Sequence, residues 1–313
     1  MVGAGLVYAA TRAAQLRRRA DLRGQVALIV GGSRGLGLAL AREFAAAGCR
    51  LVIAARDEGD LAEARRVLEA QGAEVVSCRC DVGNRADIDL AVAAARERFG
   101  AIDLLVNVAG LIQVGPAESM TMDDFRNSFA VNFWAPLHAM DAVIREMRDR
   151  RRGRIVNITS IGGVIPLPHL LPYVCSKAAA VALSEGLGAE LSKDGIKVTT
   201  VIPGLMRTSS FPHAWFKGDA SRELAWFRAL STSRLTAASA DRAARRIVAA
   251  VARGDSQLVL TLSAKVGRVT TALLPGFVRH LFAFANRLLS NGSGDRNKDE
   301  RSGQVLLASR APA

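Results

Sequence analysis

The feature that most constrains the fold is an alternation of short apolar runs with amphipathic segments of helical length, which begins at Gly24. Most of these runs are continuous and rich in β-branched residues, as is typical of strands that are covered on both faces. The seven strand candidates are residues 26–30, 51–55, 74–78, 104–106, 154–158, 197–202 and 257–262. This rhythm predicts an α/β fold with a doubly wound parallel sheet of about seven strands and helices on both faces.

The chain has 313 residues, and no internal repeat or linker divides residues 24–262. We therefore expect one domain to carry both a cofactor site and a substrate site. Residues 1–23 form an N-terminal extension for which we expect an amphipathic helix, and residues 263–290 form an amphipathic, basic helical segment. Residues 291–313 begin with a polar, Gly/Ser-rich stretch that predicts a disordered tail.

The first strand candidate runs into Gly31-Gly32-Ser33-Arg34-Gly35-Leu36-Gly37 and then directly into a predicted helix. Glycines at this point allow a tight turn and let the backbone approach a pyrophosphate, while the helix N-terminus offers free N–H groups to the phosphates. A merely tight strand–helix turn is the alternative. The strand before the loop and the helix after it favour a Rossmann-type dinucleotide site.

A second motif predicts catalytic chemistry. Tyr173 and Lys177 are four residues apart on a predicted helix and so share one face, and Ser160 follows the fifth strand candidate. A tyrosine can give a proton to a carbonyl oxygen if a nearby ammonium lowers its pKa, and a serine can stabilise charge on that oxygen. A chance aromatic–lysine pair on a helix is the alternative, which the position of Ser160 disfavours.

In these motifs the chain resembles the short-chain dehydrogenase/reductase family over about residues 24–262. Gly31, Gly35 and Gly37 match the family's T-G-x-x-x-G-x-G pattern, although Val30 replaces its threonine, which should alter the rigidity of the loop. The segment Asn107-Val108-Ala109-Gly110 is similar to the family's N-N-A-G motif, with Val108 in place of the second asparagine.

The resemblance implies roles for individual residues. The catalytic residues would be Asn132, Ser160, Tyr173 and Lys177, with Asn132 anchoring a water relay and Lys177 also holding the nicotinamide ribose. The cofactor contacts would be Gly31, Ser33, Arg34, Gly35, Leu36, Gly37, Arg56, Asp81, Val82, Asn107, Ala109, Gly110, Tyr173, Lys177, Pro203, Gly204 and Thr208. The resemblance also implies a homodimer or homotetramer.

The residues at the end of the second strand candidate favour NADP(H) over NAD(H). Ala55 stands where NAD-dependent members of the family carry an aspartate that bonds the ribose 2′-hydroxyl. Arg56 follows at once and Arg34 lies in the glycine loop, and a guanidinium can bind a 2′-phosphate through two hydrogen bonds. Two solvated surface arginines are the alternative, and the adjacent Asp57 dilutes the local charge.

Two segments are expected to form the wall of the substrate site. Residues 161–172 are apolar and contain three prolines, and residues 205–230 are rich in aromatic residues. The aromatic residues are Phe211, Trp215, Phe216, Trp226 and Phe227. They predict a bulky, apolar carbonyl or alcohol substrate, unless they only pack this segment against the domain or a neighbouring subunit.

The charge balance allows several partners. Lysine and arginine number 42 against 29 acidic residues, a net charge of +13, which could suit a phosphate-bearing cofactor, an anionic membrane or nucleic acid. Residues 265–289 contain no acid and could contact a membrane peripherally, although packing on the domain is the simpler interpretation. The arginines within residues 145–154 are not interleaved with aromatic residues, so no nucleic acid is expected.

The four cysteines are too few for a disulfide framework and favour a reducing compartment, and no metal-binding cluster is visible in the sequence. We therefore expect a cytoplasmic enzyme that transfers a hydride between NADP(H) and an apolar substrate without a metal, with a location at a membrane surface as the alternative. The alternative is a catalytically silent protein that binds NADP(H) as a sensor or scaffold. The presence of all four catalytic residues counts against that alternative.

Overall fold

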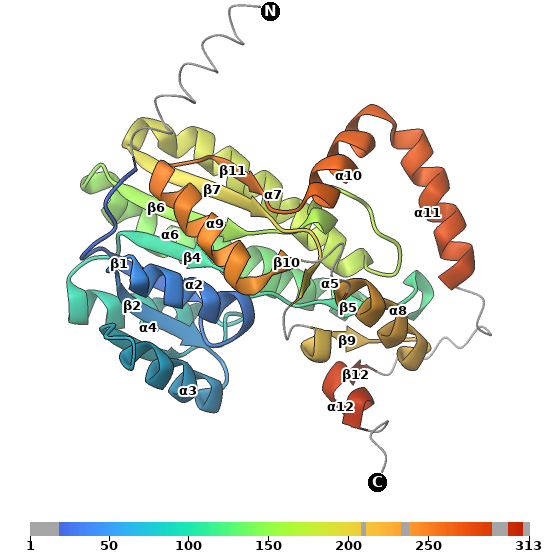
Figure 1. Ribbon diagram of the computed structural model, residues 1–313, viewed down its shortest axis with the longest axis horizontal. Helices are drawn as coiled ribbons and strands as arrows, with labels where there is room; N and C mark the ends of the chain where they lie inside the picture. The colour runs from blue at the N-terminus through green and yellow to red at the C-terminus, as the bar shows by residue number, and fades with distance from the viewer. Residues whose placement is uncertain (1–18, 208–210, 233–237, 290–299, 309–313) are drawn as a thin grey trace, which may run out of the picture.

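A computed structural model describes residues 19–207, 211–232, 238–289 and 300–308 (Figure 1). Its centre is a parallel sheet of seven strands in the order β11-β7-β6-β4-β1-β2-β3. The strands are β1 (Val26–Val30), β2 (Arg50–Ala55), β3 (Val75–Arg79), β4 (Leu104–Asn107), β6 (Gly153–Ile158), β7 (Ile196–Ile202) and β11 (Gln257–Val259). All seven predicted strands are present. The last is shorter than predicted, because Leu262 already begins the next helix.

Helices cover both faces of the sheet. The first core cluster joins one face to α2 (Gly35–Ala46), α3 (Glu58–Glu69) and α9 (Ala240–Arg253). The second cluster joins the other face to α4 (Arg85–Phe99), α6 (Ala135–Asp149) and α7 (Leu171–Leu191). Every residue of β1 and β4 is buried, which explains why these strands are continuously apolar apart from Asn107.

The order of the strands determines where a ligand can bind. Strand β1 pairs with β2 on one side and with β4 on the other. The chain adds β2 and β3 on one side of β1 and then crosses to the other side, where it adds β4 and the remaining strands. The order of the strands therefore switches between β1 and β4. In open α/β sheets the crevice at the carboxyl ends of such neighbouring strands is the usual ligand site. The loops that follow β1, β4, β6 and β7 all lie at this edge.

A smaller unit adjoins this edge. Strands β5 (Gln113–Val114), β9 (Trp215–Phe216) and β12 (Arg301–Ser302) form a three-stranded sheet beside α5 (Met122–Phe129), α8 (Ala220–Thr232) and α12 (Gly303–Ala308). The sequence predicts a disordered tail over residues 291–313, and the structure differs over 300–308. This part of the chain pairs with β9 and buries Leu306 in a third core cluster, so it gains both backbone hydrogen bonds and apolar contact.

The third core cluster also contains two of the aromatic residues that were expected to line a substrate site. Phe216 and Phe227 are buried, and their rings lie 6.0 Å apart in an edge-on arrangement. These two residues pack the segment against the domain, which is the alternative left open by the sequence. Trp226 is only partly buried and lies on the surface of the same cluster.

The last two long helices, α10 (Leu262–Leu273) and α11 (Pro275–Leu289), form an edge of the molecule beyond α7 and α8 (Figure 1). They carry most of the large apolar side chains that the structure leaves exposed. Within the described residues, no helix is long and apolar enough to span a bilayer.

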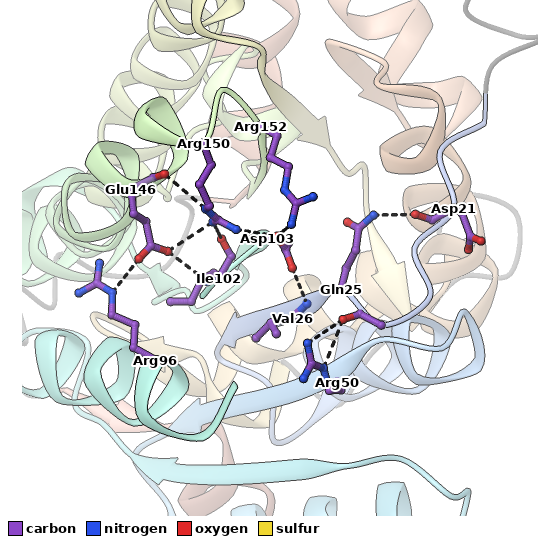
Figure 2. Close-up of polar contacts among 11 residues, drawn as sticks. Asp21, Gln25, Val26, Arg50, Arg96, Ile102, Asp103, Glu146, Arg150 and Arg152 are labelled. Atoms are coloured by element: carbon purple, nitrogen blue, oxygen red, sulfur yellow. Dashed lines mark hydrogen bonds and ion pairs between the residues drawn. The ribbon is translucent and has the colours of Figure 1, made fainter. Parts of the chain in front are cut away.

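The amino ends of the central strands are held by the polar network in Figure 2. The Asp103 carboxylate accepts hydrogen bonds from the Val26 N–H (3.1 Å) and from Arg150 (2.9 Å). Arg150 also donates to the Ile102 carbonyl at 2.6 Å, and Glu146 accepts from the Ile102 N–H at 3.1 Å. Arginines within residues 145–154 therefore hold α6 to the edge of the sheet.

Replacing Arg150 with alanine should lower the free energy of unfolding by about 1–3 kcal/mol, because the carboxylate of the partly buried Asp103 and the carbonyl of the buried Ile102 each lose a charged donor. Arg145→Ala is the matched control, since Arg145 lies exposed on the same helix. Denaturant titration of both variants measures the effect. Equal stability of the two variants would show that the network does not contribute.

Candidate functional site

The glycine loop after β1 is shaped by close backbone contacts. Gly31 has a φ of +95°, and a Cβ at this position would lie 2.5 Å from the backbone nitrogen of Ala109. A Cβ at Gly37 would overlap the carbonyl oxygen of Gly31. Both positions therefore require glycine, because any larger residue would push the loop away from β4 or from α2.

This loop fits the pyrophosphate of a dinucleotide. Arg34 is the N-cap residue of α2, and its side chain makes no capping hydrogen bond, while the first turn of the helix carries no acid. The N–H groups of this turn are therefore directed into the crevice together with the partial positive charge of the helix. A phosphate group could accept hydrogen bonds from these N–H groups, and the partial positive charge of the helix would attract it.

The residues expected near the adenosine lie around the end of β2. Arg56 is exposed there, and the Arg34 guanidinium lies 2.9 Å from the Asp60 carboxylate in an ion pair that is also largely exposed. Asp57 does not face the crevice as a free carboxylate, because it caps α3 by accepting a hydrogen bond from the Asp60 N–H at 2.7 Å. Both arginines therefore lie where the sequence predicts them, with Asp60 as a competing partner for Arg34.

The segment after β7 reaches this part of the site. Burial lowers the pKa of His213, the positive charge of Arg34 lowers it further, and Asp60 opposes both effects. No sequence motif marks His213 as a ligand contact. Its electrostatic interaction with Arg34 nevertheless shows that this segment lies near the glycine loop.

The other expected cofactor residues follow the carboxyl ends of β3, β4 and β7. Val82 and Asn107 are buried, and the Ala109 N–H donates to the Val30 carbonyl at 2.9 Å. A Cβ at Gly204 would overlap the hydroxyl oxygen of Thr261, so this turn also needs glycine. The remaining members of the set are Ser33, Gly35, Leu36, Asp81, Gly110 and Pro203, which lie in the same loops. Thr208 lies outside the described residues.

The catalytic candidates come together at the same edge of the sheet. Ser160 lies two residues beyond the end of β6, and its hydroxyl oxygen accepts a hydrogen bond from the Gly162 N–H at 3.0 Å. Ser160 and Tyr173 lie on either side of Gly162, where a Cβ would be 3.4 Å from the Ser160 hydroxyl oxygen and 3.3 Å from Cε1 of the Tyr173 ring. Lys177 lies one turn further along α7, with its Nζ 6.0 Å from the centre of the Tyr173 ring.

Burial controls the charge of both α7 residues. It raises the pKa of Tyr173, although the hydrogen bond with Ser160 acts in the opposite direction. It also lowers the pKa of Lys177 to about 8. The sequence argument expected an ammonium to lower the pKa of Tyr173, and this was wrong, because burial raises it. The Lys177 ammonium donates to the Ile158 carbonyl at 3.1 Å, and desolvation of the phenol outweighs its influence.

Asn132 lies in a π-helical turn, η2 (Ala130–Trp134), between α5 and α6. Its side chain accepts from the Leu111 N–H at 3.0 Å and donates to the Leu111 carbonyl at 2.9 Å and to the Ser176 hydroxyl at 3.0 Å. A Cβ at Gly110 would lie 3.3 Å from the Asn132 amide oxygen and 3.6 Å from Lys177 Nζ. Asn132 and Lys177 therefore flank the backbone of Gly110.

Sequence reasoning missed a buried polar network beside the site. His169 precedes α7 with a φ of +61°, and its ring nitrogens lie 2.8 Å from the Glu223 carboxylate and 3.0 Å from the Asn286 amide oxygen. The Trp226 indole N–H donates to the same carboxylate at 2.6 Å. These contacts join the loop before Tyr173 to α8 and α11. Nothing in the sequence marks residues so far apart as partners.

A second missed network lies under α5. The Lys217 ammonium and the Asp124 carboxylate form a buried ion pair at 2.8 Å, and Gln113 donates to Asp124 at 2.9 Å and to Glu300 at 3.0 Å. This network joins β5, β9 and the C-terminal residues. In the part of the chain that the structure describes, no group of three His, Cys, Asp or Glu side chains could hold a metal ion.

Because burial lowers the pKa of Lys177, the free energy of unfolding should depend on pH. An exposed lysine has its pKa near 10.5, so between about pH 8 and pH 10.5 the unfolded chain binds more protons than the folded protein, and stability rises with pH. Lys177→Met should therefore be more stable than the wild type at pH 7. Its advantage should shrink by up to about 1.4 kcal/mol per pH unit across that range.

Denaturant titrations of both proteins without cofactor, from pH 7 to pH 10.5, measure this difference. Both proteins retain Tyr173, so titration of the phenol affects the two in the same direction. Parallel stability profiles would show that Lys177 carries no depressed pKa.

Comparison with known proteins agrees with this geometry. Residues 25–215 match the family described as short chain dehydrogenase. A dehydrogenase/reductase SDR family protein 7-like of Anopheles gambiae is 34% identical over 78% of this chain and 77% of its own length. A 3beta-hydroxysteroid dehydrogenase 1 of Eggerthella lenta is 33% identical over 60% of this chain and 73% of its own length.

A solved structure also shares the fold. L-Sorbose reductase from Gluconobacter frateurii, complexed with NADPH and L-sorbose, has a TM-score of 0.69 and 28% identity, covering 77% of this chain and 97% of that one. The match to the family spans the glycine loop and the segment from Ser160 to Lys177. The chain therefore belongs to the short-chain dehydrogenase/reductase family of oxidoreductases, which act on alcohol and carbonyl groups.

Proposed function

We propose that the protein is an NADP(H)-dependent reductase of a bulky, apolar carbonyl compound, with Tyr173 as its acid and base. The observation that carries this proposal is the grouping of Ser160, Tyr173 and a buried Lys177 next to the glycine loop. A binding protein without turnover would not need a phenol and a buried amine at the place where a substrate carbonyl meets the cofactor.

The nicotinamide cofactor, when bound, supplies the hydride. The Tyr173 phenol gives its proton to the carbonyl oxygen of the substrate, and its raised pKa keeps it protonated until then. Ser160 donates a hydrogen bond to the same oxygen as negative charge develops on it. The protonated amine of Lys177 then stabilises the phenolate that remains. In the oxidative direction the same groups act in reverse.

Asn132 has a positioning role in this proposal. It binds the backbone of Leu111 on one side and the Ser176 hydroxyl on the other, and that hydroxyl donates to the Tyr173 carbonyl at 2.9 Å. Asn132 thus links the loop after β4 to the turn of α7 that carries Tyr173. This link would keep the distance between the cofactor and the phenol constant.

The preference for NADP(H) rests on Arg34 in the glycine loop and on Arg56 at the end of β2. The related L-sorbose reductase structure contains NADPH, which supports a phosphate-bearing cofactor in this fold. The proposal that the substrate is bulky and apolar rests on two features. One is the half-buried apolar loop between Ser160 and Tyr173, and the other is the pair of partly exposed residues Trp215 and Trp226. The name of the steroid dehydrogenase relative is consistent with such a substrate.

Tyr173→Phe should lower turnover by about 100-fold or more, because a positioned proton donor contributes about 10²–10⁴ to the rate. The measurement is NADPH oxidation with ketones graded in size and apolarity, and wild-type activity should rise with both. The dissociation constant of NADPH, measured by titration, should stay within a few-fold of the wild type and serves as the control.

Retained turnover in Tyr173→Phe would contradict the assignment of the proton donor. Tight NADPH binding by the wild type, with no turnover of any ketone and no oxidation of the corresponding alcohols, would instead support a cofactor-binding sensor or scaffold.

Arg34→Ala combined with Arg56→Ala should reduce the ratio of kcat/KM for NADPH to that for NADH by about tenfold or more. Hydrogen bonds to a charged group contribute about 1.5–3 kcal/mol, and 1.4 kcal/mol corresponds to a factor of ten. Arg65→Ala with Arg66→Ala on α3 removes the same charge from exposed positions and is the control. An unchanged ratio in the first variant would refute the role of the two arginines.

A further inference from the structure

Helices α10 and α11 expose an unusual amount of apolar surface. Eight of their large apolar side chains, and that of Leu274 between the two helices, are at least half exposed, whereas a stable helix on a globular domain normally buries such residues. The exposed residues are Leu262, Val266, Val269, Leu273, Leu274, Phe277, Leu281, Phe284 and Leu288. The simpler interpretation of the sequence, that this apolar face packs on the domain, is therefore wrong.

Helix α10 contacts the protein through small residues. Ala264 is buried, and a Cβ at Gly267 would lie 2.6 Å from the Ile165 side chain, so this side of the helix lies against the loop that precedes Tyr173. With 3.6 residues per turn, positions 262, 266, 269 and 273 form one row on the opposite side. The contact with the domain thus fixes α10 with this apolar row directed outward.

Helix α11 is fixed in a similar way. Val278 is 6% exposed, and the Asn286 amide oxygen lies 3.0 Å from the His169 ring, so these residues define its inner side. Phe277, Leu281, Phe284 and Leu288 follow the same four-residue and three-residue spacing as the row on α10 and are 50–61% exposed. The hydrogen bond of Asn286 prevents the helix from turning this row inward.

The charges beside the apolar rows are all positive. Residues 262–289 contain no aspartate or glutamate. Arg287 is exposed beside the apolar row of α11, and Lys265 is exposed beside the row of α10. Arg279 is exposed on the side of α11 that lies opposite its apolar row. Arg268 is not one of these outward-facing charges, because its guanidinium donates to the Gln257 side chain at the edge of the central sheet.

We propose that α10 and α11 form a docking surface for an anionic lipid membrane, with the apolar rows inserted among the acyl chains and the basic residues at the head groups. An apolar face bordered by lysine and arginine is typical of helices that lie in the membrane interface. A second copy of the chain fits less well, because a symmetric contact would bring the basic residues of both copies together. The membrane would then adjoin the loop that carries Ile165 and His169, next to the substrate side of Tyr173.

Co-sedimentation of the full-length protein with vesicles tests this proposal without any need for turnover. One set of vesicles contains only phosphatidylcholine, and the other contains equal parts of phosphatidylcholine and phosphatidylglycerol. The wild type should bind the anionic vesicles, and less so at high salt. Leu281→Ser with Phe284→Ser should lower this partitioning by about tenfold or more. Lys265→Glu with Arg287→Glu should remove the preference for anionic vesicles.

Matched controls distinguish an effect of the α10–α11 surface from the general effect of losing exposed apolar side chains or positive charges. Leu90 and Met122 are 68% and 66% exposed on other helices, so Leu90→Ser with Met122→Ser should leave binding unchanged. Lys193→Glu with Arg242→Glu changes the net charge equally at exposed positions elsewhere and should also leave the preference intact. All these positions are exposed, and thermal unfolding verifies that each variant folds.

Two results would overturn the proposal. One is equal sedimentation of the wild type and the Leu281→Ser, Phe284→Ser variant, which would mean that another segment or none binds lipid. The other is a wild-type dimer that this variant dissociates, without binding of either protein to vesicles. A second copy would then cover the apolar rows.

Discussion

The contact between the loops that follow β1 and β4 is the constraint on which the site depends. The Val30 carbonyl accepts hydrogen bonds from the N–H groups of both Val108 and Ala109 at 2.9 Å, and Gly31 lies so close to Ala109 that a side chain would not fit. The next residue is Gly110, where a Cβ would lie within 4 Å of the side chains of both Asn132 and Lys177. The phosphate-binding loop and the proposed catalytic groups are thus connected through the backbone of residues 108–110.

Burial determines how the α7 residues can act. Desolvation favours the neutral form of both groups, so the folded protein holds a protonated phenol and an amine with a pKa of about 8 at the end of β6. A protonated phenol is ready to donate in the direction of carbonyl reduction. Once it has lost its proton, the buried phenolate has a cation within the same turn of helix to stabilise it.

Local patterns in the sequence predicted the parts of this structure that local chemistry specifies. Continuous β-branched runs gave all seven central strands, and the spacing of Ser160, Tyr173 and Lys177 placed them on adjacent elements at one edge of the sheet. The sequence did not predict the His169–Glu223–Asn286 network or the packing of residues 300–308, because both depend on partners more than 50 positions away. The pKa of Tyr173 was mispredicted for the same reason, since burial is set by the tertiary fold and outweighed the neighbouring charge.

Transfer of a label from the cofactor to the product tests the central claim most directly. NADPH that carries deuterium in place of both hydrogens at C4 of the nicotinamide is incubated with the protein and a bulky apolar ketone, and the alcohol is analysed by mass spectrometry. The account predicts an alcohol with one deuterium on the carbinol carbon, formed in proportion to the NADP produced. An alcohol without deuterium, or oxidation of the labelled NADPH without any alcohol, would contradict it.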